Sequence, residues 1–395
     1  MEHTGPLAGL KVVEIGSIGP GPFCAMLLAD LGADVVRLDR ASGAALVGPN
    51  ADFRTEVMHR GRRSVAVDLK NPRGREVVLE LVRDADALLE GFRPGVTERL
   101  GVGPEDCWAV NPRLVYGRMT GYGQDGPMAQ AVGHDLNYVA QSGVLSMIGR
   151  AGRAPVPPLS LVGDFGGGGL ILALGLLAAV IEARESGRGQ VVDAAMTDGA
   201  ALLGAAFHGF VSNGTWHSGN AGRGTNIVDS GAPFYDAYAC SDGAYLAVAA
   251  MEPHFYAELL EVLELDPATL PPQLDQSQWP ALKQTIADRV RTRTRADWVA
   301  RADGRACVSA VLDPEEAWAH PHNVARQTFT ELAGVTQPTP QPRFGRTPAR
   351  IDGPPPAPGE HTRSALADWG VDPDTIAAWE QAGAVRQESL QEEMA

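Results

Sequence analysis

Arginine side chains gather beside the predicted strands of the first hundred residues. They are Arg37, Arg40, Arg60, Arg62, Arg63 and Arg93. Guanidinium groups suit phosphate oxygens, and open α/β sheets bind ligands beyond the carboxyl ends of their strands. This arrangement predicts an anion site, although a solvated surface is the more common place for any single arginine and stays open as the alternative.

A glycine-rich turn follows the first predicted strand. Gly16, Gly19 and Gly21 stand where a dinucleotide-binding protein carries G-x-G-x-x-G, but their spacing differs from that motif. Pro20 and Pro22 also lack the backbone N–H donors that a pyrophosphate requires. We interpret the segment as a tight strand-to-helix turn, which makes an NAD- or FAD-dependent dehydrogenase a distant alternative.

Composition and charge restrict the class of partner. The 395 residues are 44% hydrophobic and 21% charged, which is typical of a globular protein, and the net charge is −15. This charge repels nucleic acids and anionic membranes, so no nucleic-acid partner is expected. An anionic ligand must therefore be bound by a local basic cluster. The length predicts two domains.

The cysteines and the N-terminus indicate a cytoplasmic protein. The four cysteines are widely spaced and form no Cys-x-x-Cys pair, which predicts free thiols and no metal site. Residues 1–10 lack the pattern of a secretory signal. The most apolar run, 170–181, is shorter than a membrane span and is predicted to be a buried helix.

Strand and helix patterns alternate in the first hundred residues. The predicted strands are 11–15, 34–38, 64–69 and a strand from 87, and the predicted helices are 23–31 and 72–84. Helix 72–84 has Asn71 as its expected N-cap and one apolar face. This order predicts a parallel sheet with crossover helices.

The pattern changes near residue 230. Two short strands, 235–240 and 244–249, flank a hairpin turn. Further elements are predicted as helices 254–263, 278–291 and 296–301 and strand 306–312. A second domain is therefore expected to begin here. Residues 334–358 are rich in proline and predict an extended tether.

Six motifs occur in the order of a known family. They are ADVVR (33–37), EGFRPGV (90–96), GHDLNY (133–138), GDFGGG (163–168), GQVVDA (189–194) and PRF (342–344). Together they resemble the α-methylacyl-CoA racemase branch of the class III CoA-transferases. The resemblance extends from the N-terminus to about residue 350, and the tail from Gly359 is similar to other ends in the superfamily.

The resemblance implies an α/β fold with an N-terminal Rossmann-like large domain and a smaller α+β domain, assembled as an interlocked homodimer. The expected division is a large CoA-binding domain (1–190), a helical linker (191–229), a small domain (230–330), and a return segment with the C-terminal tail (331–395). The implied substrate is an acyl-CoA, and no cofactor is expected beyond the coenzyme A that is part of this substrate. Its binding is expected at the arginines named above, at Arg37, Arg62 and Arg93 foremost, with Asp135.

The resemblance also implies the chemistry. Inverting the carbon beside a thioester requires a base and an acid, and the resemblance assigns these roles to His134 and Asp164. A neutral imidazole accepts protons near neutral pH, whereas an aspartic acid donates usefully only if burial raises its pKa. Asp164 precedes four glycines and an apolar helix, and the N–H groups there are expected to face a developing enolate oxygen. The same helix start is expected to lower the pKa of Asp164, which opposes the effect of burial. The sequence leaves that balance open.

Two residues are expected to support the pair. Glu252 corresponds to the family's glutamate that orients the catalytic histidine across the dimer, although a carboxylate before Pro253 is also typical of a helix start. Ser160 stands where the racemases usually carry an asparagine that partners the aspartate, and serine reaches less far. Without the resemblance, Asp164 would be interpreted as a helix cap and His134 as a structural histidine.

Other functions stay open. In a CoA-transferase of the same superfamily, Asp164 would be a nucleophile that carries CoA as an aspartyl thioester. A CoA-binding protein without catalysis would use the arginines alone. His134 favours the racemase, because the transferases generally lack a histidine there. The acyl group stays undetermined among branched fatty acyl, bile-acid precursor and arylpropionyl thioesters.

Overall fold

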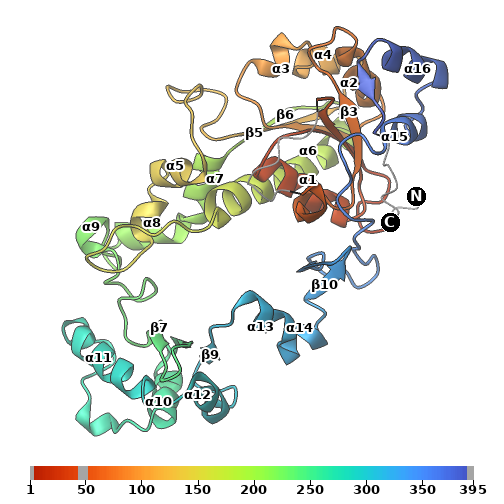
Figure 1. Ribbon diagram of the computed structural model, residues 1–395. Coiled ribbons are helices and arrows are strands. Elements are labelled where there is room, and N and C mark those ends of the chain that lie inside the picture. The colour runs from red at the N-terminus through yellow and green to blue at the C-terminus, as the bar shows by residue number, and fades with distance from the viewer. Residues whose placement is uncertain (1–3, 43–51, 389–395) are drawn as a thin grey trace. The chain divides into compact units, whose positions relative to one another are not determined.

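The computed structural model describes residues 4–42 and 52–388. Within them the chain divides into two compact units (Figure 1). The first unit contains the chain up to Ser142, Leu159–Leu203 and the chain from His322 onward, and the second contains Gly143–Pro158 and Gly204–Pro321. The chain therefore leaves the first unit twice and returns to it twice.

These boundaries correct the domain division expected from the sequence. Residues 143–158, expected in the large domain, belong to the second unit. There Arg223 donates hydrogen bonds to the carbonyl oxygens of Ser146 and Arg153. Residues 191–203, expected in a linker, belong to the first unit because they add a strand to its sheet. The remainder of the expected linker belongs to the second unit.

A seven-stranded sheet forms the first unit, with the order β12-β3-β2-β1-β4-β5-β6. Its strands are β1 (Lys11–Ile15), β2 (Asp34–Arg40), β3 (Arg63–Val67), β4 (Ala87–Glu90), β5 (Val115–Thr120), β6 (Val191–Ala195) and β12 (Val385–Arg386). All neighbours pair in parallel except β12, which is antiparallel to β3. The strand order 3-2-1-4-5-6 is that of Rossmann folds, so the predicted parallel sheet is confirmed.

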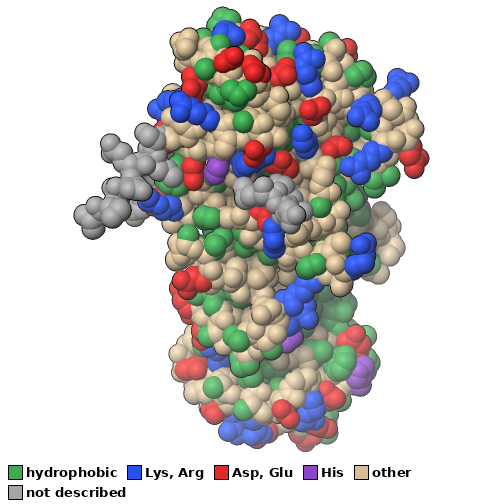
Figure 2. Space-filling model, turned by 90° about the vertical axis from the view of Figure 1, so that its right-hand side faces the viewer, with side chains coloured by type: hydrophobic (Ala, Val, Ile, Leu, Met, Phe, Trp, Pro, Cys, Tyr) green, Lys and Arg blue, Asp and Glu red, His purple; other side chains and the backbone are tan. Residues whose placement is uncertain are grey.

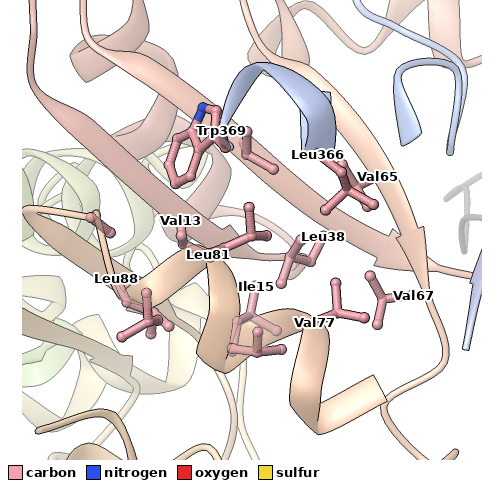
Figure 3. Close-up of a cluster of buried hydrophobic side chains, with 14 of the residues drawn as sticks. Val13, Ile15, Leu38, Val65, Val67, Val77, Leu81, Leu88, Leu366 and Trp369 are labelled. Atoms are coloured by element: carbon pink, nitrogen blue, oxygen red, sulfur yellow. The ribbon is translucent and has the colours of Figure 1, made fainter. Parts of the chain in front are cut away.

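Helices cover both faces of this sheet. Alternate residues of β1 enter different cores: Val12 packs with α1 (Pro20–Asp30) and α6 (Ile171–Ser186), and Val13 packs with α2 (Gly74–Val82). Figure 3 shows the second of these cores, in which strand side chains meet those of α2. Strands buried on both faces are typical of parallel sheets.

The C-terminal segment completes that core. Helix α15 (Thr362–Asp368) packs on β3, and its Leu366 and the following Trp369 lie among the side chains of the first strands (Figure 3). Figure 1 also shows α16 (Pro373–Gln381) beside α15. The predicted tether 334–358 is only partly correct, because it begins in a hairpin of β10 (Phe329–Leu332) and β11 (Val335–Pro338).

Helix starts differ from the predictions by a few residues. Helix α1 begins at Pro20 after Gly19 (φ 72°), three residues before the predicted start, because proline is compatible with the first turn. Helix α2 begins at Gly74, and Asn71 accepts a hydrogen bond from the backbone of Arg73 instead of capping the helix directly. The unit's other helices are α3 (Val96–Arg99), α4 (Pro104–Trp108), α5 (Asp135–Gln141) and α7 (Met196–Leu203), with α14 (Pro321–Ala325) at its edge.

The apolar run predicted at 170–181 lies in a longer helix. A π-helical segment, η4 (Leu161–Leu170), continues directly into α6, so one helix extends over Leu161–Ser186. The expectation that this run is too short to span a membrane is therefore wrong on length, although core helices of soluble proteins share this length and composition. Its predicted burial holds for one face only, since Leu174 is 65% exposed.

The second unit has its own sheet and core. Strands β7 (Tyr235–Ala239), β8 (Tyr245–Ala249) and β9 (Val308–Ala310) form an antiparallel sheet, which confirms the predicted hairpin. Its helices are α8 (Ala205–Ser212), α9 (Gly219–Gly222), α10 (Pro253–Val262), α11 (Trp279–Val290), α12 (Arg295–Ala302) and α13 (Pro314–Ala319). The core is centred on buried aromatic side chains, including Phe234 and Trp298.

Candidate active site

A cavity of about 690 Å³ lies beyond the carboxyl ends of β1, β4 and β5. Its wall includes Ser17 and Gly19 after β1 and the segment 91–94 after β4. The strand order reverses between β1 and β4, and ligands of open α/β sheets bind at such a reversal. The same cavity is lined by His134 and Asp164, so the structure brings the two predicted proton carriers together.

His134 lies at the N-cap of α5, where its backbone N–H donates a hydrogen bond to Asn137 Oδ1 at 3.1 Å. This bond to the backbone fixes the residue at the helix start. The side chain is exposed, and among the described residues the imidazole has no hydrogen-bond partner. Its two ring nitrogens are therefore available for proton transfer at the cavity.

Asp164 lies in the first turn of η4, half-buried in the cavity wall. Burial, followed by the negative charge of Asp135, raises the pKa of Asp164 to about 6, and His134 opposes this shift. Burial is thus the largest cause of the raised pKa of Asp164. Asp164 also lies over the turn after β1, since a Cβ added to Gly19 would be 3.2 Å from Asp164 Oδ2.

The four glycines after Asp164 have a packing role. A Cβ on Gly167 would lie 2.6 Å from the backbone nitrogen of Ala200 in α7, and one on Gly169 would lie 2.6 Å from the carbonyl oxygen of Pro20 in α1. Glycine is the residue that permits such close backbone approach. These residues continue the helix, so the expectation that their N–H groups face an enolate oxygen finds no support. Their packing holds Asp164 against the cavity.

Asp135 has a different place from the one expected. It was expected to contact CoA, but its side chain is buried outside the cavity lining. Its Oδ1 accepts a hydrogen bond from the backbone N–H of Asp164 at 2.8 Å. Asp135 therefore positions the segment that carries the proposed acid, and its charge contributes to the raised pKa of Asp164.

The arginines do not form the single anion site that the sequence predicted. Arg37 and Arg62 both form ion pairs with Glu14 in β1, and all three side chains are buried. Buried Arg60 pairs with Asp30 at 2.6 Å, and buried Arg63 pairs with Asp34 at 2.7 Å and Asp368 at 2.8 Å. A buried guanidinium requires such partners, so these four residues are paired inside the protein and do not face a ligand. On the face shown in Figure 2, basic and acidic side chains are likewise interspersed.

The two remaining arginines are exposed at separate cavities. Arg93 lines the cavity with His134, and Arg40 lines a second cavity of about 520 Å³ beyond β1, β2 and β3. Lys70 also lines this second cavity, and Phe92 lines both cavities. Sequence reasoning missed these two residues, although Lys70 directly follows a predicted strand and Phe92 lies within the EGFRPGV motif.

Ser160, one of the two expected supporting residues, is not among the residues that line the cavity. Ser160 precedes η4 in a left-handed conformation (φ 60°), and its carbonyl oxygen accepts a hydrogen bond from Phe165 at 3.2 Å. Among the described residues its hydroxyl forms no hydrogen bond with Asp164, which contradicts the expected partnership. Glu252 is exposed at the N-cap of α10 in the second unit, so its expected contact with His134 stays a prediction.

The fold and the cavity define a Rossmann-like α/β protein with an imidazole and a carboxyl group at the sheet's reversal point. Residues 7–362 match CoA-transferase family III, and the chain belongs to this family. The chain is 44% identical to the alpha-methylacyl-CoA racemase of Mus musculus and 43% identical to that of Homo sapiens. Each alignment spans 376 residues, 94% of this chain and 95% of the relative.

A solved structure shows the same fold. A CaiB/BaiF family protein from Brucella suis superposes with a TM-score of 0.80 at 25% identity, over 93% of this chain and 100% of that protein. The family resemblance read from the motifs is therefore confirmed.

Proposed function

We propose that this chain is a racemase that interconverts (2R)- and (2S)-2-methylacyl-CoA thioesters. The observation that carries the proposal is the placement of His134 and Asp164 in one cavity, with the pKa of Asp164 raised to about 6. The similarity to proteins named alpha-methylacyl-CoA racemase, along nearly the whole chain, supports it.

The proton moves in two steps. The imidazole of His134 accepts the proton of the α-carbon, and the electron pair of the broken C–H bond moves onto the thioester oxygen as an enolate. The carboxyl group of Asp164 then gives a proton to the opposite face of the α-carbon. In the reverse direction Asp164 accepts and His134 donates, so each direction requires one proton on the pair. No oxidant or metal is needed for this transfer, and we propose no cofactor beyond the CoA of the substrate.

The two cavities suit the two parts of an acyl-CoA. The acyl thioester would occupy the cavity of His134 and Asp164, and the nucleotide would lie in the second cavity beside Arg40 and Lys70. These exposed cations match the phosphates of CoA in charge. Phe92, which lines both cavities, would lie beside the pantetheine that connects the two parts.

The experiment is solvent exchange without a co-substrate. A single configuration of a 2-methylacyl-CoA is incubated with the protein in D2O, and NMR and mass spectrometry follow the α-position. We expect deuterium at the α-carbon and formation of the other configuration, with no carboxylic acid added. The alternative, a CoA-transferase that uses Asp164 as nucleophile, predicts that protium is retained and that CoA passes to an added carboxylate. That second result would reject the racemase.

We also propose that the protein is a cytoplasmic homodimer with interlocked subunits. Its thiols are free, which fits a reducing compartment. Leu170, Leu174 and Ile181 are 51%, 65% and 62% exposed along the helix Leu161–Ser186, a spacing that places them near one face. A second copy would cover these side chains, and its Glu252 would orient His134.

Replacing Leu174 with aspartate tests the dimer. A charge in the proposed interface would be buried without a partner, so we expect the chains not to assemble into the dimer. Light scattering after size exclusion measures the mass. Leu274→Asp is the matched control, because Leu274 is 67% exposed but belongs to the second unit, and it should leave the dimer intact. A Leu174→Asp protein that stays dimeric would place the interface elsewhere.

A further inference from the structure

Glu90 is a buried carboxylate that the proposed proton transfer does not use. It is the last residue of β4 and is 3% exposed. Its Oε2 accepts a hydrogen bond from the backbone N–H of Phe92 at 2.6 Å. A buried carboxylate requires such donors, because burial of an unpaired charge is costly. The short bond therefore ties the strand end to the loop that follows it.

That loop forms a wall of the cavity. Gly91, Phe92, Arg93 and Pro94 all line the cavity of His134 and Asp164, and Phe92 also lines the second cavity. The loop is further restricted on its other side, since a Cβ added to Gly91 would lie 3.0 Å from the Cβ and Oγ of Ser17. A change in the hydrogen bond from the Phe92 N–H to Glu90 would therefore shift the side chain of Phe92, which lines both cavities.

The charges that face Glu90 leave it without a complete ion pair. The nearest is Arg118 in β5, whose Nε lies 4.0 Å from Glu90 Oε1 and has no hydrogen-bond partner among the described residues. The Arg118 guanidinium instead binds Glu98 and, at 2.6 Å, Gln124. Tyr116, Glu98 and Asp193 are the other titratable groups near Glu90. Burial raises the pKa of Glu90 to about 7, against the opposing effects of the Phe92 bond and Arg118.

We infer that Glu90 is a positioning residue, which holds the 91–94 loop through the Phe92 N–H and thereby sets the affinity for the CoA part of the substrate. This inference rests on the proposed function, because it takes CoA as the ligand that joins the two cavities. Glu90 does not touch the reacting carbon in this account. Its effect is expected in binding, and the proton transfer between His134 and Asp164 is expected to persist at saturating substrate.

Paired substitutions separate the hydrogen bond from the size of the side chain. Glu90→Met keeps the length but removes the acceptor, and we expect the dissociation constant for CoA to rise at least about tenfold, the effect of losing a bond of about 1.4 kcal/mol. Glu90→Gln keeps an acceptor for the Phe92 N–H and should stay within about threefold of the parent. Glu105→Gln, at an exposed position of α4, is the control and should bind CoA as the parent does. Calorimetric titration with CoA measures each value.

The pH dependence provides a second measurement if Glu90→Met fails to fold. Protonation of Glu90 below pH 7 turns a charged acceptor into a neutral, weaker one. The parent should therefore lose CoA affinity below pH 7 more steeply than Glu90→Gln, which cannot titrate. If the parent and Glu90→Gln had equal pH profiles, or if Glu90→Met bound CoA as the parent does, the role of Glu90 would be overturned and the proposed function would be unaffected. A parent protein that binds no CoA would overturn this inference and the proposed function together.

Discussion

Replacing His134 with alanine is expected to lower α-proton exchange by about 100- to 10,000-fold, the usual contribution of a positioned acid or base. The side chain lines the cavity and, among the described residues, its imidazole has no hydrogen bond whose loss would disturb the fold. Its backbone N–H keeps the bond to Asn137 whichever side chain is present. The free energy of unfolding and the dissociation constant for CoA should therefore stay close to those of the parent.

Solvent exchange in D2O and calorimetric titration with CoA measure the two effects separately. His320→Ala is the matched control, because His320 is exposed after α13 in the second unit. This variant should exchange the α-proton at the parental rate. If His134→Ala exchanged the proton as fast as the parent, another base would have to be found. A parent that binds CoA but never exchanges the proton would instead indicate a CoA-binding protein without catalysis.

Asp164→Asn is expected to cause a loss of exchange in the same range, because an amide cannot carry the proton. Unlike most losses of function, this one should come with a gain in stability. The pKa of Asp164 is raised to about 6 in the folded protein, so its ionised form is disfavoured there relative to the unfolded chain. After allowance for solvent screening, removing this charge should add about 1 kcal/mol to the free energy of unfolding at pH 7.

The pH dependence of this gain follows from the direction of the pKa shift. Below the unfolded value of 3.8, Asp164 is protonated in both states and the variant gains nothing. The gain grows between pH 3.8 and about 6 and is constant above that range. Denaturant unfolding at pH 3.5, 5 and 7 measures it. Asp84→Asn, at an exposed position after α2, is the control and should show no such trend.

The parental rates of the two directions should depend on pH in the same way. Each direction requires one proton on the pair of His134 and Asp164, and the interconversion itself releases no proton, so the ratio of the two rates at low substrate stays constant with pH. Because the pKa of Asp164 is raised to about 6, both rates should pass through a maximum where the pair carries one proton and should fall on either side of it. An unchanged stability in Asp164→Asn, together with pH-independent rates, would mean that Asp164 is not the buried acid described here.

The sheet and the two proposed proton carriers could be predicted from the sequence for different reasons. Strands such as 11–15 and 34–38 are short apolar runs between helical patterns, and this local information suffices for a parallel sheet. His134 and Asp164 were found through the family motifs, since a single histidine or aspartate is locally indistinguishable from a structural residue. Helix starts were missed by a few residues, because propensity changes only gradually there.

The arginines show where sequence information ends. Arg60 and Arg62 precede β3 and Arg63 is its first residue, so the three resemble an anion site in the sequence. Their partners Asp30, Glu14 and Asp34 nevertheless come from other strands and helices. Pairing of this kind depends on which side chains the sheet brings side by side. The missing bond between Ser160 and Asp164 and the new place of Asp135 likewise depend on how folding places these residues.

The sequence by itself determined the family, the order of strands and helices, and the two residues that we propose for proton transfer. Only the tertiary structure decided that four of the six arginines are internal, that the glycines pack helices, and that burial and the charge of Asp135 raise the pKa of Asp164. The physical reason is that apolar periodicity is a local property of the chain. Burial, ion pairing and pKa values depend on neighbours that folding brings together from distant parts of it.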